Sequence, residues 1–213
     1  RALAEHGGLR HQVRSGLEVA ELLALAIAAL VARAHAPDDP VLDQFQAAIA
    51  QAPAVPALHV NLALALFRLN RSAEAVASLE KAAELGPNEA PIHYQLGSAY
   101  VDLQAYDKAV AALTKGLAAR PDLTKDPLAA EATATLGAVY FAQGKVAEAA
   151  AEFQRVLAAT PKNASATLGM AKVHFSRGEV PKALELFERV VAEHPGTPEA
   201  TQAATFLKEL RKG

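Results

Sequence analysis

The stretch LGSAYVDLQAYDKAVAALTKGLAARP, residues 96–121, decides the fold. Apolar residues recur in it every three or four positions, which is the spacing of an amphipathic α-helix, and the pattern breaks at Gln104-Ala105. Two helices joined by a short turn are therefore expected. Pro121 ends the second helix, because proline has no N–H for the hydrogen-bond ladder and restrains the residue before it.

The same pattern returns with a period of 34 residues. Pro53, Pro87 and Pro121 are 34 residues apart, as are Pro161 and Pro195, and six residues are inserted between Pro121 and Pro161. Small residues recur in two positions of the unit and large ones in a third: Ala63, Gly97, Gly137 and Ala171; Ala75, Ala109, Ala149 and Ala183; Leu79, Leu113, Phe153 and Phe187. Small residues let two helices approach closely and large ones fill the remaining space, so stacked helix pairs are expected.

The composition agrees with an all-α protein. Alanine, the best helix former, fills 51 of the 213 positions, whereas aromatic residues make up only 5% of the chain. The net charge of -2 gives no basic surface for nucleic acid. The chain has no cysteine, which excludes a disulfide-stapled fold and thiolate chemistry and is compatible with either the cytoplasm or the periplasm.

The pattern Leu96-Gly97…Tyr100…Ala109…Leu113…Pro121 resembles the tetratricopeptide repeat (TPR), as does Leu136-Gly137…Tyr140…Ala149…Phe153…Pro161. The resemblance implies an all-α, right-handed helical solenoid of antiparallel helix pairs that serves as a scaffold. The high alanine content, which is common in GC-rich genomes, indicates a bacterial source. The expected segments are an N-terminal helical segment 1–21, a degenerate repeat 22–55, repeats 56–89, 90–123, 130–163 and 164–197, an insertion 124–129 and a C-terminal cap helix 198–213.

Two segments depart from the regular repeat. The longest apolar run, Leu22–Ala32, is too short to span a membrane. It is apolar on every face, so we expect the helix 41–52 to cover one side and residues 1–20, a partner subunit or a second copy to cover another. A cleaved signal peptide is the remaining alternative. The first residue is Arg1 rather than Met, which indicates a processed or truncated product. In the insertion, Asp126 before Pro127 predicts a helix N-cap, so the next helix starts early and forms either a contact ridge or a neutral elongation.

No catalytic, metal or cofactor motif is found in the sequence. The seven histidines are scattered, and His6 and His11 are five residues apart rather than the four that place two ligands on one helix face. His59 and His93 share one repeat position, which indicates packing beside a helix turn. The protein is therefore expected to be no enzyme and to bind neither cofactor nor metal.

The resemblance implies that function lies on a concave surface lined by the first helix of each repeat. The positions exposed there in the family correspond to an apolar groove with a few charges: Val60, Leu64, Phe67, Arg68, Tyr94, Ser98, Val101, Asp102, Glu131, Phe141, Leu168, Lys172 and Phe175, with Ala134, Ala138 and Ser165 beside them. The alternative is that the N-terminal segment covers Val60, Leu64 and Phe67.

The expected partner is another protein or a peptide segment. Part of the family binds acidic chain termini through a clamp of Lys, Asn and Arg; the matching positions hold other residues: Val60, Leu64, Gln95, Glu131 and Thr135. An apolar or amphipathic segment therefore suits the groove better than a chaperone terminus. Three hypotheses stay open: a scaffold or adaptor subunit of a hetero-complex, a regulatory or substrate-docking segment of a larger enzyme or membrane-anchored protein, and a self-assembling scaffold.

Overall fold

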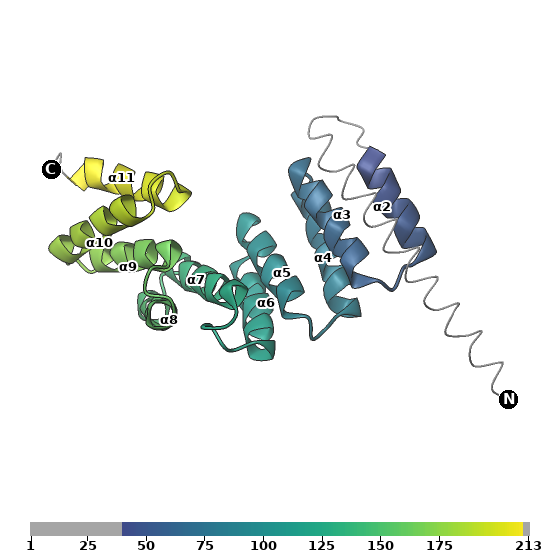
Figure 1. Cartoon of the computed structure of the whole chain (residues 1–213), viewed down its shortest axis with the longest axis horizontal. Helices are drawn as coiled ribbons and strands as arrows, with labels where there is room; N and C mark the ends of the chain where they lie inside the picture. Colours follow the sequence, from purple (N-terminus) through teal and green to yellow (C-terminus); the bar gives the residue numbers. More distant parts are fainter. Residues whose placement is uncertain (1–39, 211–213) are drawn as a thin grey trace. The chain divides into compact units, whose positions relative to one another are not determined.

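The computed structural model describes residues 40–210 (Figure 1). In this range the chain forms ten α-helices, α2 to α11, and no β-strand, which confirms the all-α fold class. The helices divide into two compact units, one ending at Pro87 and the other beginning at Asn88. None of the described helices is long and apolar enough to cross a membrane. The expectations for residues 1–21, Leu22–Ala32 and His6–His11 fall outside the described residues.

The first unit contains α2 (Pro40–Gln51), α3 (Pro56–Arg68) and α4 (Ser72–Leu85). Helix α3 contacts both of the others, and each helix places one large apolar side chain in the shared core: Phe45, Leu58 and Leu79. Pro56 is the first residue of α3. An N–H at this position has no acceptor within the helix, so proline, which lacks the N–H, costs no hydrogen bond there. The burial of one apolar stripe per helix is what holds the three together.

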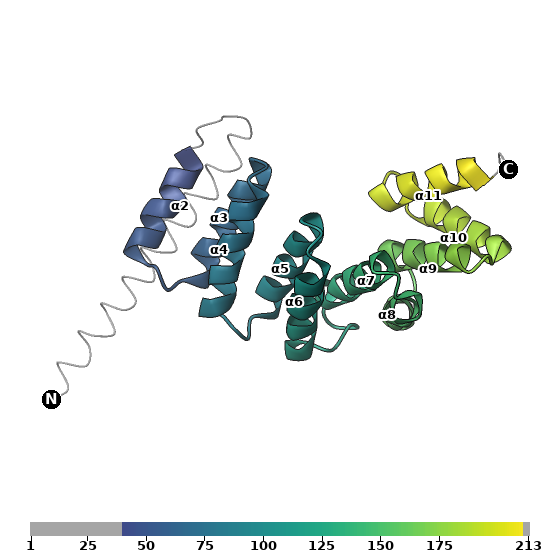
Figure 2. The ribbon, with the colours of Figure 1, turned by 180° about the vertical axis from the view of Figure 1, so that it is seen from behind.

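The second unit consists of three helix pairs and a final helix, as can be followed in Figure 2. Its bounds are α5 (Ala90–Asp102), α6 (Tyr106–Ala119), α7 (Pro127–Ala142), α8 (Val146–Ala159), α9 (Ala164–Ser176), α10 (Val180–Glu193) and α11 (Pro198–Leu210). The first helices contact one another in a row, α5 to α7, α7 to α9 and α9 to α11. The second helix of each pair also contacts the first helix of the next. This unit is therefore a solenoid in which each pair buries its apolar stripe against its neighbours.

The turns inside the four helix pairs share one backbone geometry. The second residue after each first helix has a positive φ: 58° at Asn70, 57° at Gln104 and 75° at Gly144 and Gly178. The next N–H donates back to the carbonyl five residues earlier, as from Ala105 to Tyr100 at 2.8 Å. This is a Schellman ending, which satisfies carbonyls that a helix end leaves without partners. The turn predicted from the sequence at Gln104-Ala105 is confirmed.

The small and large repeat positions meet as the sequence predicts. A Cβ added at Gly97 would lie 2.5 Å from Leu113 Cγ, and one at Gly137 would lie 2.8 Å from Phe153 Cε1. Real Cβ atoms do not approach other carbons so closely, so these glycines allow the two helices of a pair to touch. The invariant alanines of the other small position are fully buried: Ala75, Ala109, Ala149 and Ala183.

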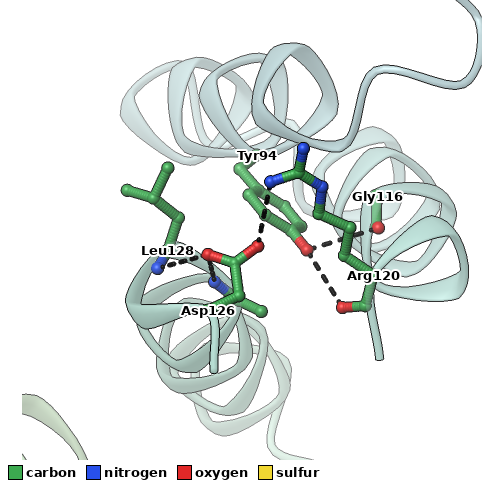
Figure 3. A network of polar contacts seen from close by, with 6 residues as sticks. Tyr94, Gly116, Arg120, Asp126 and Leu128 are labelled. Atoms are coloured by element: carbon green, nitrogen blue, oxygen red, sulfur yellow. Dashed lines mark hydrogen bonds and ion pairs between the residues drawn. The ribbon is translucent and has the colours of Figure 1, made fainter. Parts of the chain in front are cut away.

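Helix α7 starts early, and Asp126 is its N-cap, which confirms that sequence prediction (Figure 3). The Asp126 carboxylate accepts hydrogen bonds from the N–H groups of Leu128 at 3.0 Å and Ala129 at 3.3 Å. The helix has 16 residues, compared with 13 in α5 and α9. Two otherwise unpaired N–H groups at the helix start are thereby satisfied.

Helix α11 closes the described part of the second unit. It contacts α9 and α10 through Ala200, Ala203 and Leu207, all of them buried. Its remaining face carries Lys208 and Glu209, which are exposed. The helix therefore combines an apolar inner stripe with a polar outer side, as an end helix of a solenoid requires.

Candidate partner-binding groove

A groove of about 550 Å³ lies along α7 and α9, the first helices of the last two pairs, and along the final helix α11. We call it the α7–α9–α11 groove. Its lining is mostly apolar, with a small number of charged and polar groups: Glu131, Ala134, Thr135, Ala138, Phe141, Ala142, Phe153, Ser165, Leu168, Gly169, Lys172, Glu199, Gln202 and Phe206. An apolar hollow with a few fixed polar groups is the usual character of a binding site.

The floor of the groove depends on two glycines that face one aromatic ring. A Cβ at Gly169 would lie 2.3 Å from Phe153 Cζ, and the Gly137 position approaches the same ring. Phe153 is only 2% exposed, although it lines the groove. Leu168 from α9 and Ala134 from α7 are likewise buried at the floor. Side chains this well packed give the groove a fixed shape.

One end of the groove is acidic. The hydroxyl oxygen of Ser165 lies 3.0 Å from an Oε1 of Glu131 and 3.1 Å from an Oε1 of Glu199. The three residues are spaced by 34 positions and come from α7, α9 and α11. Neither glutamate forms an ion pair with any residue in the range 40–210. Two negative charges therefore stand beside a single hydroxyl.

The groove also holds one ammonium group, that of Lys172 on α9. Its Nζ donates to Gln202 Oε1 at 3.1 Å and lies 5.8 Å from the centroid of the Phe206 ring. Burial lowers the pKa of Lys172, because the charged form loses part of its hydration. No carboxylate of the described chain lies within ion-pair distance of this ammonium.

Aromatic rings form the wall next to Lys172. Phe206 of α11 stacks on Phe187 of α10, with ring centroids 4.9 Å apart and planes inclined by 5°. Phe175 of α9 lies 6.4 Å from Phe206 and remains 40% exposed. An exposed ring held against a buried stack offers apolar surface for an incoming side chain.

The structure brings together only part of the groove predicted from the sequence. Four of the thirteen residues line the α7–α9–α11 groove, and Phe175 contacts its wall through Phe206. The four are Glu131, Phe141, Leu168 and Lys172. Another four, Val60, Leu64, Phe67 and Arg68, lie on α3 in the first unit. Ser98, Val101 and Asp102 lie on α5 and do not line this groove.

The placement of Tyr94 differs from the prediction. Its side chain is buried between α5 and α6, and its hydroxyl lies 3.3 Å from the carbonyl oxygens of Gly116 and Arg120 (Figure 3). Burial raises the pKa of Tyr94, an effect to which the charge of Asp126 adds. The ring turns inward because Gly116 leaves space for it. Tyr94 is therefore a core residue and not a surface for partners.

Sequence reasoning missed six residues of the groove: Ala142, Phe153, Gly169, Glu199, Gln202 and Phe206. Glu199 and Gln202 continue the 34-residue spacing into α11, at 34 positions from Ser165 and Leu168. Extending the repeat register into the final helix was the signal that would have found them. Phe153 was missed for a different reason. It occupies a repeat position that the sequence assigned to the core, and in the structure it also forms part of the groove floor.

The histidines, acidic residues and Ser165 of the described chain form no arrangement typical of a catalytic or metal site. His59 is buried, with Nε2 3.0 Å from the carbonyl oxygen of Pro53, and His93 is buried as well. Within residues 40–210, no three acidic or histidine side chains converge in a way that would hold a metal ion. The hydroxyl of Ser165 has carboxylates as its neighbours, and no imidazole that would act as a base.

The chain belongs to the tetratricopeptide repeat family. One family model matches residues 42–90 and 94–164, and a second matches residues 140–206. These matches cover more than half of the chain, in the region where the structure shows the helix pairs. The fold of this family is a scaffold for protein–protein interaction.

Individual relatives resemble parts or the fold of this chain. The Hsp70-Hsp90 organizing protein of Triticum aestivum is 42% identical over 77 residues, which are 36% of this chain and 13% of that protein. PilF of Pseudomonas aeruginosa superposes with a TM-score of 0.72 at 16% identity, over 91% of this chain and 84% of its own. YrrB, a TPR protein with an unusual peptide-binding site, gives 0.62 at 20% identity, over 78% and 82%. At these identities the two structures share the fold with this chain.

Proposed function

We propose that this chain is a non-catalytic protein-interaction module that holds a segment of a partner protein in the α7–α9–α11 groove, as an adaptor or assembly subunit of a larger complex. The observation that supports this most is the groove itself. Three helices that contact one another in a row, α7, α9 and α11, build it, its floor is tightly packed and apolar, and its charged groups lie at defined places along it. A volume of about 550 Å³ suits a few residues of a bound segment.

The groove does not favour an acidic chaperone terminus as its partner. A clamp for such a terminus needs cations, whereas Glu131 presents a carboxylate and Thr135 a hydroxyl at the matching positions. The similarity to the Hsp70-Hsp90 organizing protein covers only 13% of that protein, and it supports the fold of this module. The peptide-binding site of YrrB is a precedent on the same fold for a groove that takes a peptide.

The experiment that tests the proposal selects peptides from a displayed random library on the purified chain. The Ala138→Arg variant places a long side chain in the groove from an exposed position of α7. Ala151→Arg introduces the same residue on an exposed position of α8, outside the groove, and is the matched control. Circular dichroism checks that both variants remain folded.

The expected result is that peptides enriched on the unmodified chain bind the Ala151→Arg control with unchanged affinity and lose at least tenfold on Ala138→Arg. Equal binding to both variants would place the binding surface elsewhere. If no peptide is enriched, the proposal of a peptide groove is wrong.

A further inference from the structure

The two ends of the α7–α9–α11 groove carry opposite charges. Glu131, Ser165 and Glu199 form the acidic end, and Lys172 lies seven residues beyond Ser165 on the same helix. At 1.5 Å per residue this separation is about 10 Å along α9. Between the two ends runs the apolar floor. A ligand that spans the groove therefore meets carboxylates at one end and an ammonium group at the other.

The acidic end has less hydrogen-bond donation than its two carboxylates require. The hydroxyl of Ser165 has one hydrogen, so it donates to Glu131 or to Glu199 at a given moment and not to both. Both carboxylates lie beside the same hydroxyl oxygen, at 3.0 and 3.1 Å, so one cationic side chain placed there would be close to both. An ammonium or guanidinium group has the several donors that two carboxylates need.

The opposite end lacks an anion. The ammonium of Lys172 is half-buried beside the ring of Phe206, and its one hydrogen-bond partner in the described chain is the neutral amide of Gln202. An ammonium group has three donors, so further donors are available to a ligand. A carboxylate brought into the groove would pair with a cation that is already partly desolvated, where such a pair is stronger than in water.

We propose that the groove selects an extended partner segment in the polyproline II conformation that carries a lysine or arginine side chain and, three residues away, a carboxylate, with apolar side chains between them. The basic side chain lies between Glu131 and Glu199, and the carboxylate pairs with Lys172. The carboxylate belongs either to an aspartate or glutamate or to the end of the partner chain. This inference rests on the proposed function and adds the chemistry of the segment.

The spacing of the two charged ends suits a short extended segment. A chain in the polyproline II conformation rises about 3.1 Å per residue and completes a turn every three residues, so side chains three residues apart lie on one face, about 9 Å from each other. This separation matches the roughly 10 Å between Ser165 and Lys172 along α9.

The test uses synthetic fluorescent peptides and anisotropy titration at low and at physiological salt. The matched peptide has lysine, leucine, valine and aspartate in succession between glycines, with an amidated end. A second peptide has aspartate in place of the lysine, and a third has lysine in place of the aspartate. In a fourth, a free terminal carboxylate replaces the aspartate, which distinguishes the two sources of the anion.

Four protein variants separate the contributions of the two ends. Glu131→Gln with Glu199→Gln neutralises the acidic end, and Lys172→Met neutralises the other. Glu148→Gln with Glu185→Gln removes the same two charges from exposed sites on α8 and α10, outside the groove, and is the control for net charge. In a charge-reversal variant, Glu131→Lys with Glu199→Lys, the acidic end becomes cationic.

We expect the matched peptide to bind at least fivefold more tightly than the second and third peptides, with a preference that shrinks as salt rises. The double glutamine variant should abolish the preference for lysine, Lys172→Met the preference for a carboxylate, and the control variant neither. The charge-reversal variant should bind the second peptide best.

Two results would overturn the inference, and they differ from a failure of the proposed function. If library-selected peptides bind in the groove but show no charge preference, the groove binds peptides and the charge rule is wrong. If preferences survive in both neutralised variants, the charges lie elsewhere. If Ala138→Arg leaves all binding unchanged, the proposed function itself is wrong.

Discussion

The hydroxyl oxygen of Tyr94 lies 3.3 Å from the carbonyl oxygen of Gly116, and the Tyr94 ring occupies the space that a Cβ at Gly116 would need. The sizes of the residues at these two positions vary in opposite directions from repeat to repeat. At the two matching positions the other units carry a smaller first residue and a larger second one: Val60 with Ala82, Ala134 with Val156, and Leu168 with Val190. Tyrosine fits inward only where glycine faces it.

Replacing Gly116 with alanine should therefore lower stability. The new Cβ would lie 2.7 Å from Tyr94 Cδ1, and overpacking of this kind costs about 1–3 kcal/mol, against a gain of about 1 kcal/mol in helix propensity. The net loss should be measurable as a lower free energy of unfolding in urea. With Tyr94→Leu already present, the same Gly116→Ala change should become neutral or stabilising. An unchanged cost in that background would contradict the packing argument.

The turns give a second prediction that concerns the backbone alone. Gln104 adopts a φ of 57°, whereas the equivalent turn at residue 144 has glycine at a φ of 75°. Side-chain-bearing residues pay about 1–2 kcal/mol for this conformation. Gln104→Gly should raise the free energy of unfolding by about 1 kcal/mol, and Gly144→Gln should lower it similarly, since no neighbour crowds a Cβ at 144.

Thermal and urea unfolding of these two variants and of the double exchange would measure the effect. The double exchange should restore the stability of the unmodified chain, because it moves one strained residue from one turn to the other. If Gly144→Gln is harmless, the backbone conformation costs less than this argument requires.

Sequence reasoning recovers the fold better than the groove, for a physical reason. The helices and turns follow from a 34-residue period that is repeated in every helix pair. The small residue at Ala109 and the large one at Leu113 recur in each pair, so one pair is enough to predict how all of them pack. The binding surface instead depends on which side chains of neighbouring helices fill the space between them, and these residues differ from repeat to repeat. The repeat position of Tyr94 predicted an exposed side chain, but its ring is buried because Gly116 leaves space for it in the core.

The missed residues of the groove have a similar cause. Helix α11 reads as a polar end cap, yet Glu199 and Phe206 complete one side of the α7–α9–α11 groove. Their roles come from the contact of α11 with α9, which no local pattern in 198–210 expresses. By contrast, the role of Asp126 as an N-cap could be predicted from the sequence, because an N-cap depends only on the residues that follow it.

That N-cap gives a third prediction. Asp126→Ala should reduce the free energy of unfolding by about 1 kcal/mol, because the N–H groups of Leu128 and Ala129 lose their acceptor. Asp126→Asn should cost only a few tenths, since an asparagine oxygen still accepts. The lost ion pair with Arg120 should matter little, because it is long, at 3.5 Å, and the arginine side chain is 58% exposed. Urea unfolding measures both variants, and an asparagine variant as unstable as alanine would show that charge, not capping, matters here.

The last prediction concerns pH and Lys172. Burial lowers the pKa of this lysine in the folded chain relative to the unfolded chain, where it has its ordinary value of about 10.4. Between the lowered pKa and the ordinary one, the unfolded state binds more protons than the folded state, so stability rises with pH across that window. Below the lowered pKa, the charged lysine imposes its full cost on folding.

Lys172→Met removes this titration and keeps the length of the side chain. The variant should therefore be more stable than the unmodified chain near neutral pH, and its advantage should decrease as pH rises toward the ordinary lysine pKa, because there the unmodified chain also folds with a neutral group. The difference in urea-unfolding free energy between the two proteins, taken from pH 7 upward, isolates Lys172, since tyrosines and other lysines titrate in both. A difference that stays constant with pH would mean that the ammonium keeps its hydration in the groove. If a carboxylate-bearing peptide binds as proposed, adding it should reverse the advantage, because only the unmodified chain gains the ion pair.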